Sequence, residues 1–418
     1  MPSGASPTLE THATPAAAAD TRSIRSSLQG VFKWLEDHDY RAYDTFDGLN
    51  ARYLRPLTLN QPLLRIVLQQ GVRRFPLNLR PLLGIKRECS TKGAGFLVRG
   101  FIRLYQSTGN CAWRSRAESM LQWLLDNRSP GYSGSCWGNH FDYQSRSGFE
   151  KKLSPSVVWT SLIGHAFLDA FDTFQNEQYL ETALSACTHI ELDLGAYRED
   201  NVLCIHYFPT STHQVHNANT LGASLLARTS SYKPNKRWSD LAARAMLYTA
   251  KYQRSDASWY YGEEPKLHWV DNFHTAYVLD CFNWYRRATD DNQFDRQMMD
   301  GYWYWKNTFF LPDGTPRYYD YKTLPLDIQC CSQAIDTLVF FRDRDRDSLS
   351  LALKVAQWTI KNMQDPSGYF YYRRYSRWIV NKTPTLHWGQ ATMFCALAGL
   401  SQALVEPKPE SNALATAI

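Results

Sequence analysis

A short stretch of the chain, Leu267–Tyr277, carries a high density of groups that can transfer protons or bind a polar ligand. It contains His268, Trp269, Asp271 and His274, together with an amide and two further aromatic rings. Imidazoles and carboxylates are the usual general acids and bases of enzymes. Aromatic faces can stack on a ring-shaped ligand while polar groups fix its orientation. The composition of this stretch is therefore typical of the rim of a ligand pocket.

Carboxylates are the first candidates for chemistry, because acid–base reactions on sugars usually use a pair of them. We expect Asp271 to act as a general acid or base, and Glu263 or Asp142 to supply the second carboxylate. Asp is also a frequent N-cap of helices, which is the structural alternative for Asp271 and for Asp327.

Two histidines offer a second kind of chemistry. His216 and His274 could abstract a proton near neutral pH, as a sugar epimerase or a uronate lyase requires. The structural alternative is that each ring only satisfies hydrogen bonds in the core. The dipeptide His387–Trp388 repeats the order of His268–Trp269, which favours equivalent positions for both pairs in a repeated fold.

The elements that must position these residues follow a regular helical pattern. Apolar residues recur at helical spacing in consecutive pairs of segments, and the first segments of successive pairs lie about 55–60 residues apart. The pairs are expected at 95–105 with 113–127, 157–174 with 177–190, 217–230 with 237–253, 271–287 with 293–307, and 327–341 with 348–362. Single helices remain at Ser23–Asp37 and at about His387–Leu404.

If the two single helices pair with each other, six helical hairpins close a ring, and the sequence predicts an all-α fold, the (α/α)6 toroid. We expect the toroid to span residues 23–405, with a basic, irregular segment at about 40–90 that prolines interrupt. Residues 1–22 and 406–418 are expected to be disordered tails.

The repeat also predicts where a site would lie. The loops that precede the first helix of each hairpin should emerge on one face of the ring. Indole rings in these loops would stack on sugar rings, and imidazoles and amides would bind hydroxyl groups or shuttle a proton. The substrate-binding candidates in these loops are Trp137, His140, Asn217, Asn219, Trp269, Asp327, Gln329, His387, Trp388 and Gln390.

The bulk composition excludes several classes of protein. The chain has 418 residues, of which 44% are hydrophobic and 21% charged, as in soluble globular proteins. A net charge of +6 is too small to indicate nucleic-acid binding. No apolar run is long enough to cross a bilayer, and the N-terminal residues lack the apolar centre of a secretory signal. The nine scattered cysteines favour free thiols in a reducing compartment, the cytoplasm.

The sequence lacks the usual metal and cofactor signatures. Cys330 and Cys331 are adjacent, whereas zinc ligands are usually spaced, and no His-Glu-x-x-His motif occurs. Neither a glycine-rich phosphate loop nor a Gly-x-Ser-x-Gly motif is present. We therefore expect no metal and no cofactor. The basic segment could bind a diphosphate or an anionic membrane surface, or could be a solvated wrap around the ring.

Several motifs resemble one bacterial family when they are taken together. They are Asn78–Ile85, Cys136–Gln144, Val215–Asn219, Tyr261–Glu263 and Trp269–Thr275. As a set they resemble the VpsJ-type polysaccharide-biosynthesis proteins of bacteria, over the region between Tyr40 and Leu400. The resemblance implies an α/α toroid, as in the six-hairpin glycosidases, and a role in the production of surface polysaccharide. It implies no established reaction, so it assigns no catalytic role.

These observations together predict a carbohydrate-active protein of bacterial surface or exopolysaccharide biosynthesis, which acts on a glycosidic bond or a sugar ring by carboxylate acid–base chemistry. Three alternatives stay open: a sugar epimerase or uronate lyase with histidine bases, a non-catalytic saccharide-binding or scaffold protein, and an isoprenoid-processing toroid. The expected partner is a saccharide, either free or linked to a lipid or a nucleotide, with peripheral contact to the polysaccharide-synthesis machinery. No nucleic-acid partner is expected.

Overall fold

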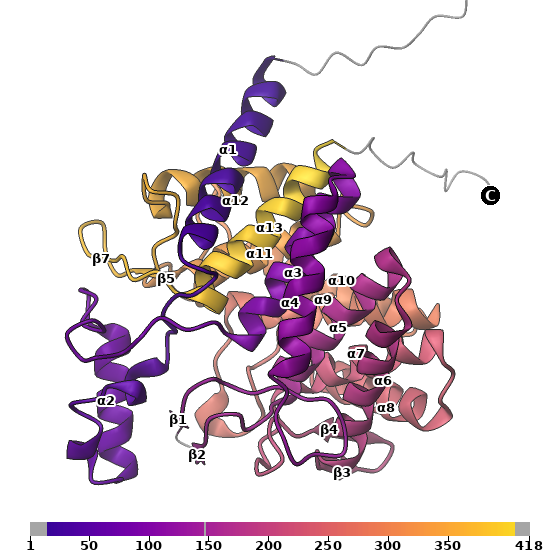
Figure 1. Cartoon of the computed structure of the whole chain (residues 1–418). Helices are drawn as coiled ribbons and strands as arrows, with labels where there is room; N and C mark the ends of the chain where they lie inside the picture. Colours follow the sequence, from indigo (N-terminus) through magenta and orange to yellow (C-terminus); the bar gives the residue numbers. More distant parts are fainter. Residues whose placement is uncertain (1–14, 146–147, 406–418) are drawn as a thin grey trace, which may run out of the picture.

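The structure, a computed structural model, describes residues 15–145 and 148–405. Within these ranges it contains thirteen α-helices and three small antiparallel sheets. Six helices form an inner ring, and six others cover this ring from outside (Figure 1). None of the helices in this part of the chain has the length and apolar character that crossing a bilayer would need.

The inner ring consists of one helix from each hairpin. Each inner helix packs against the next, and α13 packs against α3, so that the ring closes. The inner helices are α3 (Thr91–Thr108), α5 (Val157–Phe174), α7 (His216–Tyr232), α9 (Asn272–Thr289), α11 (Ile328–Phe340) and α13 (Ala391–Ala403). Most of their side chains are buried, because ring neighbours cover two sides and an outer helix covers a third.

The outer helices complete the hairpins. They are α1 (Pro15–Asp37), α4 (Cys111–Asp126), α6 (Glu177–Leu192), α8 (Lys236–Lys251), α10 (Asp295–Thr308) and α12 (Ser348–Met363). Because α1 packs against α13, the first and last helices pair as predicted, and the (α/α)6 toroid is confirmed. α1 begins at Pro15, so residues 15–22 are helical and not part of a disordered tail. The other residues of the two expected tails, 1–14 and 406–418, lie outside the described residues.

Aromatic side chains fill the seam where the two ends of the chain meet. Phe394 of α13 lies between Phe32 of α1 and Phe101 of α3, with ring centroids 5.9 and 5.1 Å away. Gly100 of α3 permits this approach, since a Cβ at its position would lie 2.6 Å from the Phe394 ring. Burying each such ring contributes about 1.5–3 kcal/mol, which opposes the entropy lost in joining distant segments.

The connections into the inner helices carry the strands and short helices. β1 (Tyr143–Gln144) pairs with β2 (Phe149–Glu150), β3 (Ala196–Glu199) with β4 (Val202–Ile205), and β6 (Arg373–Arg374) with both β5 (Leu326–Asp327) and β7 (Val380–Asn381). The short helices η3 (Pro265–Leu267) and η4 (Leu386–Gln390) precede α9 and α13. These connections gather at one end of the ring, which we call the mouth.

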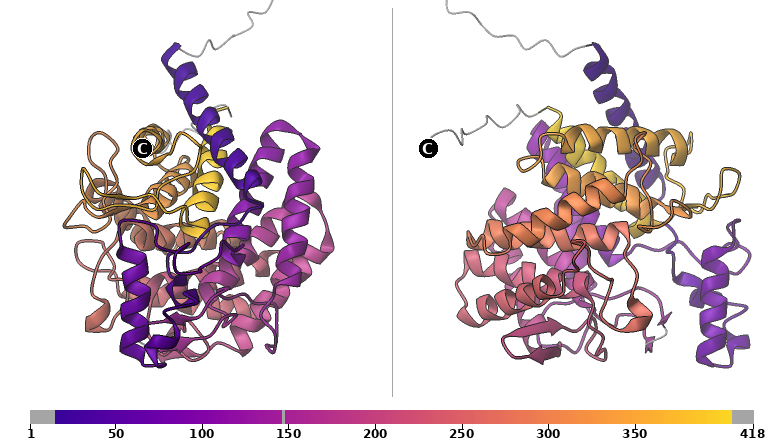
Figure 2. Two further views of the ribbon diagram at one scale, coloured as in Figure 1. Left: turned by 60° about the vertical axis from the view of Figure 1, so that its left-hand side comes forward. Right: turned by 180° about the vertical axis from the view of Figure 1, so that it is seen from behind.

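The segment at 40–90, here called the lobe, protrudes beside the ring (Figures 1 and 2). It contains η1 (Asp47–Asn50), η2 (Pro56–Thr58) and α2 (Pro62–Arg74). A small core of its own contains Tyr43, Ala51, Val72 and Ile85. The lobe is therefore built around one short α-helix, α2, and consists otherwise of turns and short 3-10 helices.

Candidate functional site at the mouth

Asp271 and Asp327 both cap inner helices at the mouth. Oδ1 of Asp271 accepts a hydrogen bond from the backbone N–H of His274 at 3.0 Å, and Asp327 accepts one from Gln329 at 3.1 Å. Both residues are therefore N-caps, which is the structural alternative that the sequence offered for them. Oδ2 of Asp327 lies 2.8 Å from Arg373, which neutralises this fully buried carboxylate.

Asp271 also holds the imidazole of His274. Its Oδ2 accepts hydrogen bonds from Nδ1 of His274 at 2.7 Å and from Nε1 of Trp269 at 3.0 Å. The indole of Trp269 is fixed further by stacking on Tyr261, with centroids 4.6 Å apart. Asp271 is only 2% exposed and both its oxygens are engaged, so its geometry suits orientation of His274 better than direct acid–base work.

His387 forms a second pair with a carboxylate that the sequence did not reveal. Its Nδ1 lies 2.5 Å from Oδ2 of Asp44, and both residues are buried. Burial lowers the pKa of His387, which keeps the ring neutral near pH 7. Burial alone would raise the pKa of Asp44, but the charges of His387 and His140 and the N–H of Phe46 lower it to about 2. A neutral imidazole held by a carboxylate is a geometry for a general base.

Lys92, in the first turn of α3, is the second residue that the sequence reasoning missed. Its Nζ lies 4.9 Å from the ring centroid of Trp159 and 5.7 Å from that of Tyr277. Burial lowers the pKa of Lys92 to about 8, against the attraction of Asp44. Lys92 stands within the run Thr91–Val98, whose other residues are small or apolar. A charged residue in such a run indicates a buried cation, and this signal could have identified Lys92.

Polar atoms without partners also gather at the mouth. Buried N or O atoms without a hydrogen-bond partner among the described residues include Nε1 of Trp159, Oδ1 of Asn217, Oε1 of Gln329 and both ring nitrogens of His387, whose Nδ1 lies near Asp44 without hydrogen-bond geometry. Each such group costs about 1–3 kcal/mol when nothing binds it. Atoms of this kind are the places where a ligand or an ordered water would bind.

Three predicted binding residues are instead structural. Trp137 is fully buried and donates its indole N–H to the carbonyl of Leu124 at 2.8 Å, so it cannot stack on a ligand. Asn219 fixes backbone groups of β4 and α8. Gln390 accepts from the N–H of Phe370 at 2.7 Å and donates to its carbonyl at 2.8 Å. The polar groups of these three side chains already form hydrogen bonds within the protein, which hold connecting segments against the ring.

The other two candidate carboxylates are paired and lie at the edge of the mouth. Asp142 forms an ion pair with Arg55 of the lobe and accepts the backbone N–H of Lys152 at 2.8 Å. Glu263 lies 2.6 Å from Nε2 of His216, which is itself buried. Within the described residues no hydrogen bond or ion pair joins these groups to Lys92 or His387, although His216 lines the same small cavity as Asp271 and His274.

Two of the predicted stacking rings remain at the mouth. Trp388 is half-buried and packs against Phe273 at 5.5 Å, beside the imidazole of His274. Arg73 of α2 lies 5.5 Å from the Trp388 ring. Trp269 is also half-buried. Burial lowers the pKa of His140 to about 4 and outweighs the charge of Asp44, which raises it.

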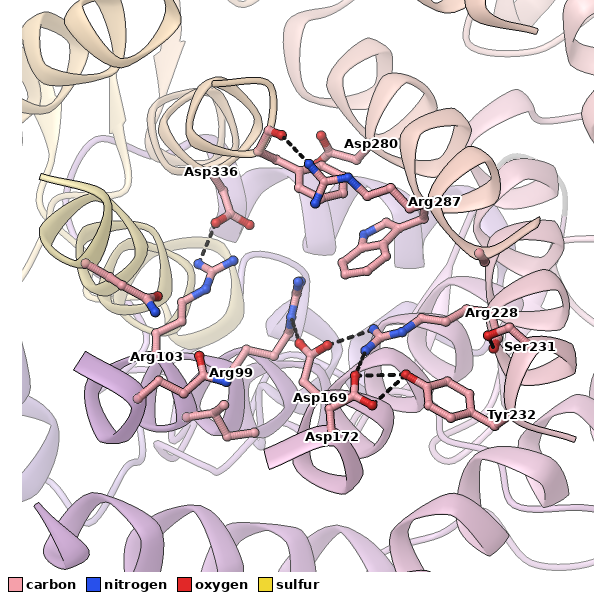
Figure 3. A pocket seen from close by; sticks show the side chains of 16 residues that line it. Arg99, Arg103, Asp169, Asp172, Arg228, Ser231, Tyr232, Asp280, Arg287 and Asp336 are labelled. Carbon is pink, nitrogen blue, oxygen red and sulfur yellow. Dashed lines mark hydrogen bonds and ion pairs between the residues drawn. The ribbon is translucent and has the colours of Figure 1, made fainter. Parts of the chain in front are cut away.

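The mouth holds little empty volume in this conformation. The cavity that borders Asp271 and His274 measures about 10 Å³, which is room for no more than one water molecule. A saccharide that occupied it would have to displace the side chains that close it. A larger cavity, of about 450 Å³, lies at the opposite end of the ring (Figure 3).

The opposite cavity is lined mainly by charges that already have partners. Asp169 lies between Arg99 at 2.9 Å and Arg228 at 2.7 Å, and Asp336 lies 2.5 Å from Arg103 (Figure 3). These ion pairs connect α5 to its neighbours α3 and α7, and α3 to α11. We therefore assign the candidate site to the mouth, which holds oriented imidazoles and several unpartnered polar atoms, in spite of the larger volume at the other end.

Comparisons with known proteins support the fold. No family model and no curated protein sequence matches the chain. Among solved structures, a cellobiose 2-epimerase from Bacillus thermoamylovorans has a TM-score of 0.58 at 12% identity, covering 75% of this chain and 90% of its own. A family 76 α-mannanase of Bacteroides thetaiotaomicron has a TM-score of 0.58 at 13% identity, covering 77% and 88%. A D-mannose isomerase has 0.55 at 11%, covering 75% and 86%. The chain thus shares the (α/α)6-toroid fold with these enzymes.

Proposed function

We propose that the protein is a carbohydrate-active enzyme that moves a proton on a reducing sugar, as an epimerase or isomerase does. The observation that carries this proposal is a pair of imidazoles at the mouth. His387 and His274 each contact a carboxylate through Nδ1, at 2.5 and 2.7 Å, which leaves Nε2 for a substrate. His274 lies on α9 and His387 lies at the entrance of α13, and α11 stands between these two helices in the ring.

In this mechanism the two imidazoles act on one carbon atom. One neutral imidazole takes the proton from the carbon next to the sugar carbonyl, and the C–H electrons form the double bond of an enediolate. The protonated imidazole returns this proton, or the other imidazole delivers one from the other side. Lys92 is a suitable group to stabilise the developing oxyanion, because a buried cation acts in a low dielectric.

Hydrogen-bonding groups around the imidazoles would fix the sugar. The unpartnered oxygens of Asn217 and Gln329 can accept hydrogen bonds from hydroxyl groups, and Trp269 and Trp388 can stack on a ring. Hydrolysis by a carboxylate pair is less well supported, because Asp44, Asp271 and Asp327 each already contact a cationic or imidazole side chain. The same holds for Asp142 and Glu263.

The biological context is a further part of the proposal. The motif resemblance supports a substrate that belongs to surface or exopolysaccharide assembly, either free or linked to a lipid or a nucleotide. All nine cysteines are unpaired and most of them are buried, which supports a reducing compartment such as the cytoplasm.

Turnover in heavy water tests the chemistry directly. The full chain would be incubated in D2O with mannose, cellobiose and related reducing sugars, and the products followed by NMR and mass spectrometry. We expect a changed ratio of stereoisomers or of aldose to ketose, with deuterium at the carbon next to the carbonyl. His387→Gln and His274→Gln should each lower the rate by about 10²-fold or more. His189→Gln, which changes a histidine on the outer helix α6, should not.

Other products would exclude the proposal. Release of smaller sugars without deuterium at this carbon would indicate a hydrolase, and an unsaturated product that absorbs in the ultraviolet would indicate a lyase. Saccharide binding without any turnover, retained in both histidine variants, would indicate a binding protein.

A further inference from the structure

The outward face of α2 is apolar, although the outward face of a surface helix is usually polar. Positions 63, 64, 67, 71 and 74 fall within about 100° of the helix circumference. Among them, Leu63 is 70%, Leu64 41% and Val67 60% exposed. The other side of α2 carries Gln69 and Val72, which are buried within the lobe. The apolar outward side chains therefore make no contribution to the core.

The surroundings of α2 extend this apolar surface. Nine of the seventeen large exposed hydrophobic side chains in the described ranges lie in the lobe: Tyr53, Leu57, Leu59, Leu63, Leu64, Val67, Phe75, Leu77 and Leu82. The β6–β7 hairpin projects on the same side of the ring as α2 (Figures 1 and 2), and its Trp378 is 82% exposed. At its base, Asn381 donates a hydrogen bond to the carbonyl of Phe75 at 2.8 Å. We call these nine residues and Trp378 the apolar face.

The lobe also carries the positive charge of the whole molecule. Residues 40–90 contain nine Arg or Lys residues and three Asp or Glu residues, a net charge of +6. The chain has 46 basic and 40 acidic residues, so 37 of each remain elsewhere and their net charge is zero. Arg80 is paired with Asp47. Arg52, Arg74 and Lys86 are exposed and form no ion pair within the described part of the chain.

We propose that the apolar face is a membrane-docking surface that binds the anionic interface of a lipid bilayer. Exposed leucines of α2 would enter the headgroup region, while Arg52, Arg74 and Lys86 would pair with anionic headgroups. Trp378 suits the same role, because indole rings favour the membrane–water interface. A second copy of the chain is a poorer occupant, because it would bring two positively charged faces together.

The apolar face adjoins the mouth. Arg73, on α2, lies 4.3 Å from the ring of Phe46 and 5.5 Å from that of Trp388, and donates a hydrogen bond to Tyr372 at 2.9 Å. A bilayer against the apolar face would therefore lie close to the imidazole group. A docked protein would present its mouth to lipid-linked saccharides, an idea that rests on the proposed function. The membrane docking itself does not depend on that function.

Vesicle sedimentation with the full chain tests the docking. The vesicles would consist of phosphatidylcholine alone or of phosphatidylcholine mixed with phosphatidylglycerol. We expect binding that is about 10²-fold tighter to the anionic vesicles, from the three unpaired cations. Leu63→Asp and Val67→Asp should each weaken it at least tenfold, since a charge would enter the interface. Leu192→Asp is the matched control, because Leu192 is a similarly exposed leucine on α6.

Three results would overturn the docking proposal. The first is no sedimentation with anionic vesicles at low ionic strength, and the second is an equal loss of binding in Leu192→Asp. The third is a dimer in analytical ultracentrifugation that Val67→Asp dissociates without any vesicle binding, which would assign the face to a second copy. Vesicle binding without sugar turnover would instead refute the proposed function and leave the docking intact.

Discussion

Lys92 is a cation enclosed by aromatic rings in the first turn of α3, where burial lowers its pKa from 10.5 to about 8. A lysine in the unfolded chain keeps its proton up to about pH 10.4. Between these values the unfolded state binds more protons than the folded state, so the free energy of unfolding should rise with pH, by up to about 3 kcal/mol from this group. Below pH 8 Lys92 is protonated in both states, so the cost of burying its charge lowers the free energy of unfolding by the full amount.

Urea unfolding between pH 7 and pH 10 measures this contribution. Lys92→Met should have a higher free energy of unfolding than the wild type at pH 7. It should lack the increase with pH that Lys92 causes in the wild type, so the two curves of free energy against pH should converge as pH increases. Lys33→Met serves as the control, because Lys33 lies on the surface in an ion pair with Asp37. Parallel curves for the wild type and Lys92→Met would contradict a lowered pKa of Lys92.

Asp271 allows a second test at the scale of single residues. In Asp271→Asn the amide oxygen can still cap α9, but the group that accepted the Nδ1 proton of His274 is lost. We expect a rate lower by about 10²-fold or more, because the imidazole loses its preferred tautomer. The free energy of unfolding should fall by about 1–3 kcal/mol, because the indole N–H of Trp269 loses its acceptor as well. A drop in stability that accounts for the whole loss of activity would make Asp271 a purely structural cap.

Only part of this site could be predicted from the sequence. The helix repeat placed Trp269, His274 and His387 at the entrance of inner helices, because this depends only on local spacing. The partner of His387 could not be found in the same way, since Asp44 lies far away in the chain and only the closed ring brings the two together. Nor does spacing tell whether a side chain such as Trp137 turns into the core or toward the mouth.

At the scale of elements, the inner helices were predictable because a helix buried on several sides leaves long apolar runs at helical spacing. The outward leucines of α2 depart from this rule, because they follow the same helical spacing but are exposed. Close packing between neighbouring inner helices depends instead on glycines. A Cβ at Gly100 of α3 would lie 2.6 Å from Phe394 and 3.3 Å from the backbone of Cys395.

A pair of glycine substitutions separates packing from helix propensity. Gly100→Ala should lower the free energy of unfolding by about 1–3 kcal/mol, because α3 and α13 must move apart. Gly71→Ala, in α2, meets no atom within 4 Å and should raise it by about 0.5–1 kcal/mol through better helix propensity. Chemical denaturation of the two variants measures both changes. Equal effects at the two sites would show that the seam between α3 and α13 is not tightly packed.

At the scale of the whole molecule, closure makes every inner helix depend on two neighbours. α13 contacts α3 and α11, and its outer partner α1 comes from the other end of the chain. In the C-terminal halves of the inner helices, the ion pair of Arg103 with Asp336 links α3 to α11, and Arg103 also donates to the carbonyl of Cys395 on α13, which lies between them. A ring of this kind differs from an open array of hairpins, in which ends can fray without affecting the centre.

Phe394→Ala tests whether the ring unfolds as one unit. The substitution removes a fully buried ring at the seam and should lower the free energy of unfolding by about 3–5 kcal/mol. Hydrogen exchange would then compare α3, next to the substitution, with α7, which lies opposite α13 in the ring. In a closed cooperative ring the most protected amides of α7 lose as much protection as those of α3, because both exchange through global unfolding. Phe75→Ala, on the exposed part of the lobe, should change neither the protection of α3 nor that of α7. Loss of protection confined to α1, α3 and α13 would mean that the seam opens locally and that the toroid behaves as an open array.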